Sequence, residues 1–477
     1  MKYNGRSILI FLASLSLVLT LCACGSSPWR YDPGTPEAPS GVVATAGDGQ
    51  VSLSFAPVAG AAGYNVYYAS APGLAAGSGA KVASIAGGAL VVPGLDNGTR
   101  YYFAVSAFNS NSESELSPEV SAVPAVSGPF RQADLQGSWR FNALSGGVDA
   151  RWMRGVLLID AAGSVSVDSY LDSEGGSVAP VGLFGIMALQ PDGSVSQEGA
   201  VAPFHGVLAA NLYKDLMVAT TTLGGGERVL AILQKSVPGI SFSDADIRGT
   251  GRLVAGPLPF VYHQLSAGLL PEWEHASCQV GQDQGVTYVS LTGPAPRPLP
   301  GGGSKVVTLS ITSGGLVSET PYPGVVPQPA ALMTQGVMSA DKLTVVATAT
   351  DLSGRPLLRI MQMVHPPAVP LNVSSYQAGE LPGDYAFHEL FGGGSPGWGY
   401  GAESVDASGG AFFSSYLDAD GSGALPAGYV LAMDQQGALS AATLPSYHGQ
   451  FSYDGALMVM TGTGAQGAPA LGIAVRR

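Results

Sequence analysis

The stretch Gly137-Ser-Trp-Arg-Phe-Asn-Ala-Leu144 returns later in the chain as Gly383-Asp-Tyr-Ala-Phe-His-Glu-Leu390, at an offset of 246 residues. The offset holds without a gap as far as 169–172 and 415–418, which share the sequence Ser-Tyr-Leu-Asp. Beyond that point it shortens slightly, as expected of a duplicated β unit that has lost residues in its loops and kept its strands. The chain therefore contains an internal repeat, and this repeat decides the architecture.

A third, more divergent copy lies between these two. Leu144 is followed by Trp152 after eight residues. The same step separates Leu265 from Trp273, and in the last copy it ends at Trp398. The three copies are predicted at residues 134–236, 246–364 and 380–477.

Each copy is predicted to hold about eight short strands, because turn signals such as Asp160-Ala-Ala-Gly163 and Pro191-Asp-Gly193 separate short apolar runs. Charged residues make up only 12% of the chain and glycine contributes 67 residues, a composition that favours an all-β class. In the first copy the strands are expected near 137–144, 152–159, 164–171, 183–189, 194–198, 204–209, 215–222 and 228–234.

Two architectures fit the roughly 24 strands expected in the repeat domain, residues 131–477. Eight strands can close as one up-and-down barrel, which gives three barrels, or they can form two four-stranded blades, which gives a six-bladed β-propeller. The copies are contiguous, and Pro-rich segments at 294–300 and 365–370 fit loops. Contiguous copies with short joins favour one closed ring, the propeller, with three eight-stranded barrels as the alternative.

Residues 39–124 precede the repeats and also alternate in the manner of short strands. The segments Val51–Phe55 and Tyr101–Ala107 have period two, and turn signals such as Asp96-Asn-Gly98 separate the strands. This stretch resembles a fibronectin type III domain over its whole length, with Tyr101 at the family's tyrosine-corner position. The resemblance implies a β-sandwich that serves as a spacer or an adhesive module.

The N-terminal segment has the pattern of a secretory signal, with positive charge before the apolar run Ile8–Leu21. That run is shorter than the roughly 20 residues needed to span a bilayer as a helix. The segment Leu21-Cys-Ala-Cys24 resembles a bacterial lipobox. The resemblance implies a signal peptide over residues 1–23, cleavage before Cys24 and lipidation of that cysteine. By analogy with Gram-negative lipoproteins, Gly25 favours the outer membrane.

The Pro/Gly-rich residues 24–38 predict a lipidated flexible tether. The formal net charge of −13 is dispersed along the chain, which argues against nucleic acid as a partner. With Cys24 lipidated, Cys278 has no disulfide partner and is expected to be a buried apolar residue.

The whole layout resembles Gram-negative envelope lipoproteins that pair a type III domain with a three-copy Gly/Trp-rich region, a likeness that implies no particular activity. We therefore expect a lipid-anchored protein of the cell envelope. Its expected partners are the membrane, through the lipid, and a polysaccharide or surface protein.

The aligned residues Trp152, Trp273 and Trp398 are the first candidates for facing a ligand. Aromatic rings at repeated positions could stack on sugars, although a core residue repeated with the packing is favoured. The aligned His263 and His388 correspond to Asn142 in the first copy. A second aligned set comprises His205, Gln335 and His448. Histidines that converge on a ring axis could hold a metal ion, but no ligand spacing such as His-x-His is present, and strand histidines with backbone partners are favoured.

A weak calcium candidate is the segment Asp418-Ala-Asp420-Gly421, which looks like the start of a calcium loop. An EF-hand would need glutamate at the twelfth loop position, where this chain has Tyr429. An Asp/Gly turn is the favoured interpretation, so no cofactor is expected.

No catalytic signature is present: the chain lacks a Gly-x-Ser-x-Gly elbow, a phosphate-binding loop and a clustered zinc pattern. Paired carboxylates for glycoside cleavage depend on the fold. Glu272, Glu274 and Glu403 are the candidates for such a pair, because they lie near the aligned tryptophans in sequence. The sequence therefore favours a non-enzymatic binding, adhesion or scaffold protein, with an extracellular glycan-active propeller enzyme, a hydrolase or lyase, as the alternative.

Overall fold

The computed structural model covers the sandwich and the repeat region. It describes residues 34–477 except 48, 76, 78, 86–88, 125–129, 180–184, 199–203, 212, 248–257, 295–303, 325–334, 365–375, 377, 394–395, 422, 445 and 465–466. The predicted signal peptide, Cys24, most of the tether 24–38 and nearly all of the joins 294–300 and 365–370 lie outside the described residues. Within the described part, no helix is long and apolar enough to cross a membrane.

The first folded unit is a β-sandwich, as predicted. One sheet has the strand order β1-β2-β5 and the other β4-β3-β6-β7, with an apolar core of alternating residues such as Val51, Leu53 and Phe103. The Tyr101 hydroxyl accepts a hydrogen bond from the Asp96 amide at 3.2 Å, the contact expected of a tyrosine corner. The strands are β1 (Val43–Gly47), β2 (Gln50–Ser54), β3 (Gly63–Ala69), β4 (Ala80–Ile85), β5 (Ala89–Pro93), β6 (Tyr101–Phe108) and β7 (Val120–Ala122).

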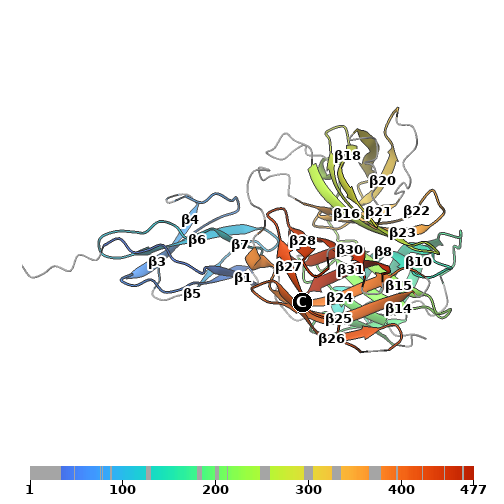
Figure 1. Cartoon of the computed structure of the whole chain (residues 1–477), viewed down its shortest axis with the longest axis horizontal. Coiled ribbons are helices and arrows are strands. Elements are labelled where there is room, and N and C mark those ends of the chain that lie inside the picture. The colour runs from blue at the N-terminus through green and yellow to red at the C-terminus, as the bar shows by residue number, and fades with distance from the viewer. Residues whose placement is uncertain are drawn as a thin grey trace, which may run out of the picture.

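Each of the three copies forms one eight-stranded antiparallel unit (Figure 1). The first, named barrel 1, is a curled sheet with edge strands β10 and β11, which an isolated bridge between Ser164 and Ile186 links. Barrels 2 and 3 are closed.

Barrel 1 comprises β8 (Gly137–Ser145), β9 (Trp152–Ile159), β10 (Val165–Asp172), β11 (Ile186–Leu189), β12 (Ser194–Glu198), β13 (Phe204–Leu208), β14 (Leu216–Thr222) and β15 (Arg228–Lys235). Barrel 2 comprises β16 (Leu258–Ser266), β17 (Glu272–Val280), β18 (Gly285–Thr292), β19 (Lys305–Ile311), β20 (Leu316–Pro321), β21 (Gly336–Met338), β22 (Thr344–Thr350) and β23 (Pro356–Met363). Barrel 3 comprises β24 (Gly383–Phe391), β25 (Gly397–Val405), β26 (Gly410–Asp418), β27 (Tyr429–Met433), β28 (Ala438–Ala441), β29 (His448–Phe451), β30 (Leu457–Thr463) and β31 (Pro469–Arg476). The 3-10 turns are η1 (Gln132–Leu135), η2 (Asp244–Asp246) and η4 (Ala378–Glu380).

The propeller prediction is wrong: the structure matches the barrel alternative, with two closed eight-stranded barrels and one curled, open sheet of eight strands. In every copy the first strand pairs with the last: β8 with β15, β16 with β23, and β24 with β31. Such pairing joins all eight strands into one curled sheet, whereas two four-stranded blades would leave these strands apart. The interior of each unit is filled by its own apolar cluster.

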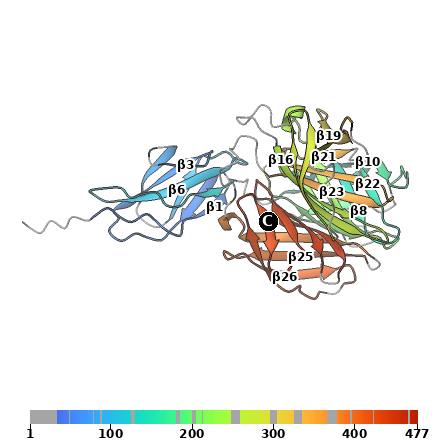
Figure 2. The ribbon, with the colours of Figure 1, turned by 45° about the horizontal axis from the view of Figure 1, so that its top comes forward.

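The three units nevertheless pack against one another (Figure 2), and each contacts the other two, which gives a ring of barrels. Strands β8 and β9 contact β22 and β23, strands β16 and β17 contact β30 and β31, and strands β24 and β25 contact β14 and β15. Interfaces of this heterologous kind close when the rotation between units completes a circle. A further apolar core, shared by all three units, fills the space between them.

The pattern of buried residues along the strands reflects the packing of the three units against one another. Strand β14 is buried on both faces from Leu216 to Thr220, because barrel 3 covers its outer face. By contrast, residues Ser166 to Asp168 of strand β10 are exposed, whereas Leu171 farther along the strand packs against the shared core. Two-sided burial explains why the sequence Leu-Met-Val-Ala lacks period two.

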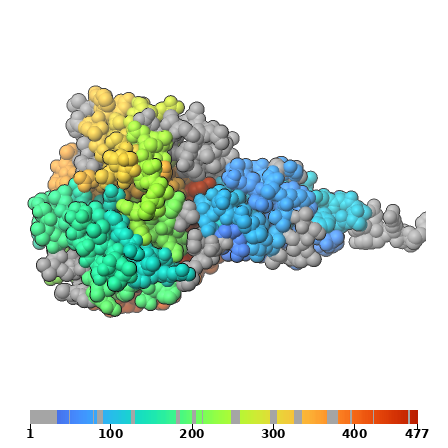
Figure 3. Space-filling view, turned by 180° about the vertical axis from the view of Figure 1, so that it is seen from behind, coloured from blue at the N-terminus to red at the C-terminus, as the bar shows by residue number. Residues whose placement is uncertain are grey.

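The sandwich is fixed to barrel 3 by a buried cation. Arg100, at the start of β6, forms an ion pair with Glu380 of η4 and donates to the Tyr453 carbonyl. Its guanidinium also lies over the Tyr453 ring, with 4.4 Å to the centroid. Burial alone would lower the pKa of Arg100, but the Glu380 carboxylate raises it above its ordinary value. The sandwich therefore projects from one side of the ring of barrels (Figures 1 and 3).

Candidate functional site

The three contacts between barrels are built on one repeated hydrogen bond. A tryptophan on the second strand of each unit donates its indole N–H to a threonine on the seventh strand of the next. The pairs are Trp152 with Thr350 at 2.8 Å, Trp273 with Thr463 at 3.0 Å, and Trp398 with Thr222 at 2.9 Å. The three rings are 8%, 2% and 1% exposed, respectively. They hold the ring of barrels together and do not form an exposed surface for stacking sugars.

A second layer of contacts lies beside the tryptophans. His263 hydrogen-bonds Thr461 at 3.2 Å and His388 hydrogen-bonds Thr220 at 3.4 Å, each across an interface. At the equivalent place Asn142 accepts a hydrogen bond from Thr348 at 3.2 Å. The aligned set predicted from sequence therefore occupies equivalent positions, but each member faces the neighbouring barrel. The two histidines and the asparagine do not converge on one axis point.

The interface between barrels 2 and 3 contains three histidines. The ring centroids of His263 and His275 are 4.9 Å apart, and those of His275 and His448 are 5.3 Å apart with nearly parallel planes. Burial, and after it the neighbouring His448, lowers the pKa of His275 to about 4. Burial, then His275 and His448, holds the pKa of His263 well below 6.5. The cluster is therefore neutral at pH 7 and fills this interface with stacked rings.

The interface between barrels 3 and 1 repeats this arrangement with one substitution. Tyr400 takes the place of His275 and stacks on His205, with centroids 4.9 Å apart and an interplanar angle of 12°. His388 packs on the same tyrosine at 5.0 Å. Burial lowers the pKa of His388 to about 3, so this contact also consists of neutral rings at pH 7.

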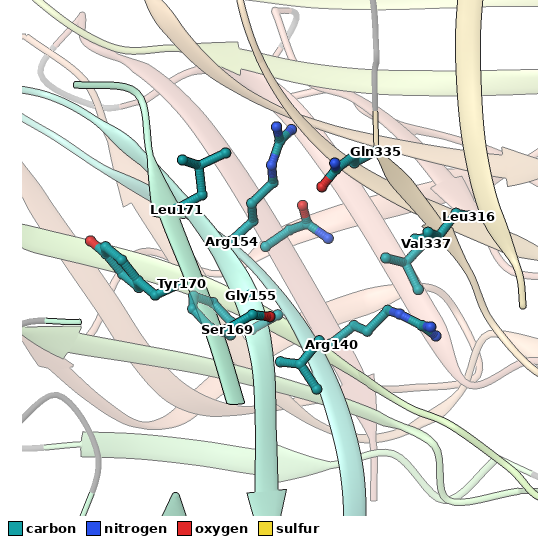
Figure 4. A pocket seen from close by; sticks show the side chains of 12 residues that line it. Arg140, Arg154, Gly155, Ser169, Tyr170, Leu171, Leu316, Gln335 and Val337 are labelled. Atoms are coloured by element: carbon teal, nitrogen blue, oxygen red, sulfur yellow. The ribbon is translucent and has the colours of Figure 1, made fainter. Parts of the chain in front are cut away.

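The interface between barrels 1 and 2 departs from the pattern. The equivalent positions hold Asn142 and Arg154 from barrel 1 and Gln335 from barrel 2, so no pair of rings fills the gap. A cavity of about 300 Å³ lies here, and Gln335 is exposed beside it. Figure 4 shows Arg140 and Arg154 extending from neighbouring strands toward Gln335 and Val337 of barrel 2. The residues that line the cavity are Arg140, Phe141, Asn142, Arg154, Gly155, Val156, Ser169, Tyr170, Leu171, Leu316, Gln335 and Val337.

This cavity carries positive charge. Arg140 donates to two neutral acceptors, Ser236 Oγ at 3.3 Å and the Gly314 carbonyl at 3.2 Å. The Arg154 guanidinium lies over the Trp152 ring, with 4.5 Å to the centroid, and burial lowers its pKa. None of the described residues that line the cavity is aspartate or glutamate. The cavity can therefore offer guanidinium and amide donors to an anionic group.

The calcium candidate has the geometry of a turn. Asp418 accepts a hydrogen bond from the Asp420 amide at 3.0 Å, and the Gly421 amide donates to the Asp418 carbonyl at 3.0 Å. The Asp420 carboxylate pairs with Arg228 at 3.1 Å. Across the described part of the chain, no group of three or more histidine, cysteine, aspartate or glutamate side chains is placed to hold a metal ion.

The carboxylates considered for catalysis lie elsewhere. Glu403 is 1% exposed inside barrel 3 and accepts a hydrogen bond from Tyr429 at 2.5 Å. Burial raises the pKa of Glu403 to about 7, and burial with the Glu403 charge does the same for Glu389. Glu272 pairs with Arg355, and Glu274 accepts from Gln264 at 3.1 Å. None of these four carboxylates lines the cavity between barrels 1 and 2.

Cys278 is buried inside barrel 2, at 2% exposure, in agreement with its expected role as a small apolar residue. Burial raises its pKa well above the ordinary value, so the thiol stays protonated and unreactive at neutral pH.

Comparisons with known proteins assign no family. No protein-family model matches the chain. Two amylopullulanases share a segment of 124 residues with it, 26% of this chain: that of Thermoanaerobacterium saccharolyticum at 37% identity and that of Thermoanaerobacterium thermosulfurigenes at 36%. The segment covers only 9% and 6% of those proteins, so the likeness concerns a small part of each.

Two solved structures show a faint likeness. A protein of unknown function from the DUF3598 family of Nostoc punctiforme has 10% identity over 48% of this chain and 97% of its own, with a TM-score of 0.19. Transferrin binding protein B of Neisseria meningitidis has 7% identity over 78% of this chain and 84% of its own, with a TM-score of 0.23. Likenesses at this level carry no argument about function.

The sequence interpretation missed one position that matters. Arg154, His275 and Tyr400 each follow an aligned tryptophan by two residues, so they share its face of the strand. Their difference in side chain decides whether the interface is filled by stacked rings or left open. The signal was present in the alignment of the copies, because all three lie 12 residues after Asn142, His263 or His388.

Proposed function

We propose that this protein is a lipid-anchored, non-enzymatic binding protein of the cell envelope, which recognises a polysaccharide or a surface protein through its ring of barrels. The observation that carries the proposal is the cavity at the interface between barrels 1 and 2. Binding sites favour concave surfaces between structural units, with a few convergent polar groups. The buried carboxylates Glu389 and Glu403 lie apart from this cavity, which favours binding over glycoside hydrolysis.

The sandwich has a spacer role in this proposal. The Arg100–Glu380 ion pair is almost fully buried, with side-chain exposures of 2% and 8%, so it fixes the orientation of the sandwich against barrel 3. A lipid at Cys24, followed by the tether and the sandwich, would hold the ring of barrels away from the membrane.

Replacing Cys24 by serine is expected to abolish lipid attachment, because the thiol is the acylated atom. The measurement is incorporation of labelled palmitate in a Gram-negative host, together with the share of protein in the membrane fraction. Cys22→Ser is the matched control, since that cysteine precedes the expected cleavage site. Equal labelling of the Cys24→Ser variant and the wild type would contradict the anchor.

The binding role is tested with the full-length protein in detergent on an array of polysaccharides and extracellular proteins. Retention of one ligand class without release of shortened products is the expected result. Release of reducing ends or unsaturated sugars would favour the enzyme alternative, and retention of no ligand would overturn the proposal.

A further inference from the structure

The cavity between barrels 1 and 2 results from a break in the repeat. At the other two interfaces, an aromatic ring two residues after the tryptophan stacks on a histidine of the next barrel. At this interface the corresponding residues are Arg154 and Gln335. The Trp–Thr hydrogen bond is present at all three interfaces. The side-chain difference therefore opens a space that the fold alone does not require.

The charge in this space is unusual for the molecule. The chain has a formal net charge of −13, which lowers the attraction of anions to its surface in general. The cavity instead gathers Arg140 from β8 and Arg154 from β9, with no acidic residue among its described lining. The hydrogen bonds of Arg140 to Ser236 and Gly314 leave its positive charge unneutralised by those partners.

We infer that this cavity binds the oxyanion group of a small ligand, with Arg140 and Arg154 as the anion-binding residues. Guanidinium groups present planar sets of donors that match carboxylate, sulfate and phosphate oxygens. The inference rests on the proposed function and deepens it by naming the class of ligand.

The rest of the lining describes the ligand further. Asn142 and Gln335 supply amide groups, while Leu171, Leu316 and Val337 supply apolar surface. A volume of about 300 Å³ lies at the small end of ligand pockets. These features fit one acidic monosaccharide unit, or a sulfate or phosphate group carried by a sugar, with Arg140 and Arg154 as the guanidinium donors of the cavity.

The experiment is calorimetric titration of the full-length protein in detergent with glucuronate, sodium sulfate, inorganic phosphate and neutral glucose. Glucuronate is expected to bind at least tenfold more tightly than glucose, and its affinity is expected to fall as salt is raised. Binding of glucuronate alone identifies a carboxylate sugar as the ligand class, whereas equal binding of sulfate or phosphate identifies a simple oxyanion. Binding of glucose as tight as that of every anion, or binding of no probe, would overturn the inference.

Variants locate the site. Arg154→Gln and Arg140→Gln are each expected to weaken anion binding at least tenfold, whereas Arg228→Gln, which removes an arginine paired with Asp420 outside the cavity lining, should leave it unchanged. The double variant Arg154→Tyr/Gln335→His copies the stacked pair of the interface between barrels 3 and 1. It should keep the fold and abolish binding. Anion binding that survives in this double variant would overturn the inference, while polysaccharide retention without anion binding would leave the proposed function standing.

Discussion

Replacing Trp398 by alanine is expected to destabilise the protein by about 4 kcal/mol, because a fully buried indole leaves a cavity when it is removed. The ring is 1% exposed, donates its N–H to Thr222 and packs against His205. It lies at the contact that closes the ring of barrels, so its loss also weakens the attachment of barrel 3 to barrel 1. Urea unfolding measures the free energy, and small-angle scattering measures the expansion that an opened ring would cause.

Two further variants test the explanation. Phe412→Ala removes an aromatic ring of the same barrel that is 57% exposed, and it should cost less than about 1 kcal/mol. Thr222→Val keeps the side-chain shape but leaves the buried indole N–H without its acceptor, at an expected cost of about 1–3 kcal/mol. If Trp398→Ala cost no more than Phe412→Ala, the indole would not hold the ring together.

The strands were predictable because their pattern is local. All eight strands expected in the first copy are present, with bounds within a few residues. Turn signals such as Asp160-Ala-Ala-Gly163 mark the ends: the Gly163 amide donates to the Asp160 carbonyl at 3.0 Å, and Gly163 has a φ of 86°. The alignment of copies also identified the buried tryptophans that recur at each interface.

The pairing of the first strand with the last in each copy was not predictable from the same pattern. Ala143 pairs with Ala231 across almost the whole length of barrel 1, and a period of two is equally compatible with that pairing or with a four-stranded blade. The sequence predicted a ring of six blades, whereas the structure forms a ring of three eight-stranded units. The deciding information is the long-range partner of the first strand, which a single sequence does not contain.

The site was only partly predictable, because the alignment of the copies shows which positions are equivalent but not which residues touch across a contact. Alignment placed His388 in one equivalent set and His205 in another, but it gave no sign that one set faces the other across a barrel contact. In the structure both pack on Tyr400, which lies two residues after the aligned Trp398. Two residues that touch across a contact between barrels occupy different positions in the aligned repeat. The alignment alone therefore cannot show that they are partners.

Lowering the pH from about 6.5 to 4 is expected to destabilise the contact between barrels 2 and 3. Burial, with His448 as a second cause, lowers the pKa of His275 to about 4, against about 6.5 in an unfolded chain. In this window the unfolded chain binds a proton that the folded protein does not, so the free energy of unfolding falls as the pH falls. For His275 alone the loss is about 3 kcal/mol, complete below pH 4.

Other buried groups act in the opposite direction. Burial raises the pKa of Glu389 and of Glu403 to about 7, so their protonated forms favour the folded state, and this contribution is lost as the pH rises through 7. The wild-type profile therefore combines both effects, and a matched variant is needed to isolate the histidine.

His275→Tyr supplies that variant, because the interface between barrels 3 and 1 already uses Tyr400 at the equivalent position, stacked on a histidine. The unfolding free energy of wild type and variant is measured by urea titration between pH 4 and 8. We expect the variant to lose about 3 kcal/mol less than the wild type on going from pH 6.5 to 4, while the two change in parallel above pH 7. Parallel curves over the whole range would show that His275 takes up no extra proton on unfolding, and the neutral stacked cluster would then not be the acid-sensitive element of this interface.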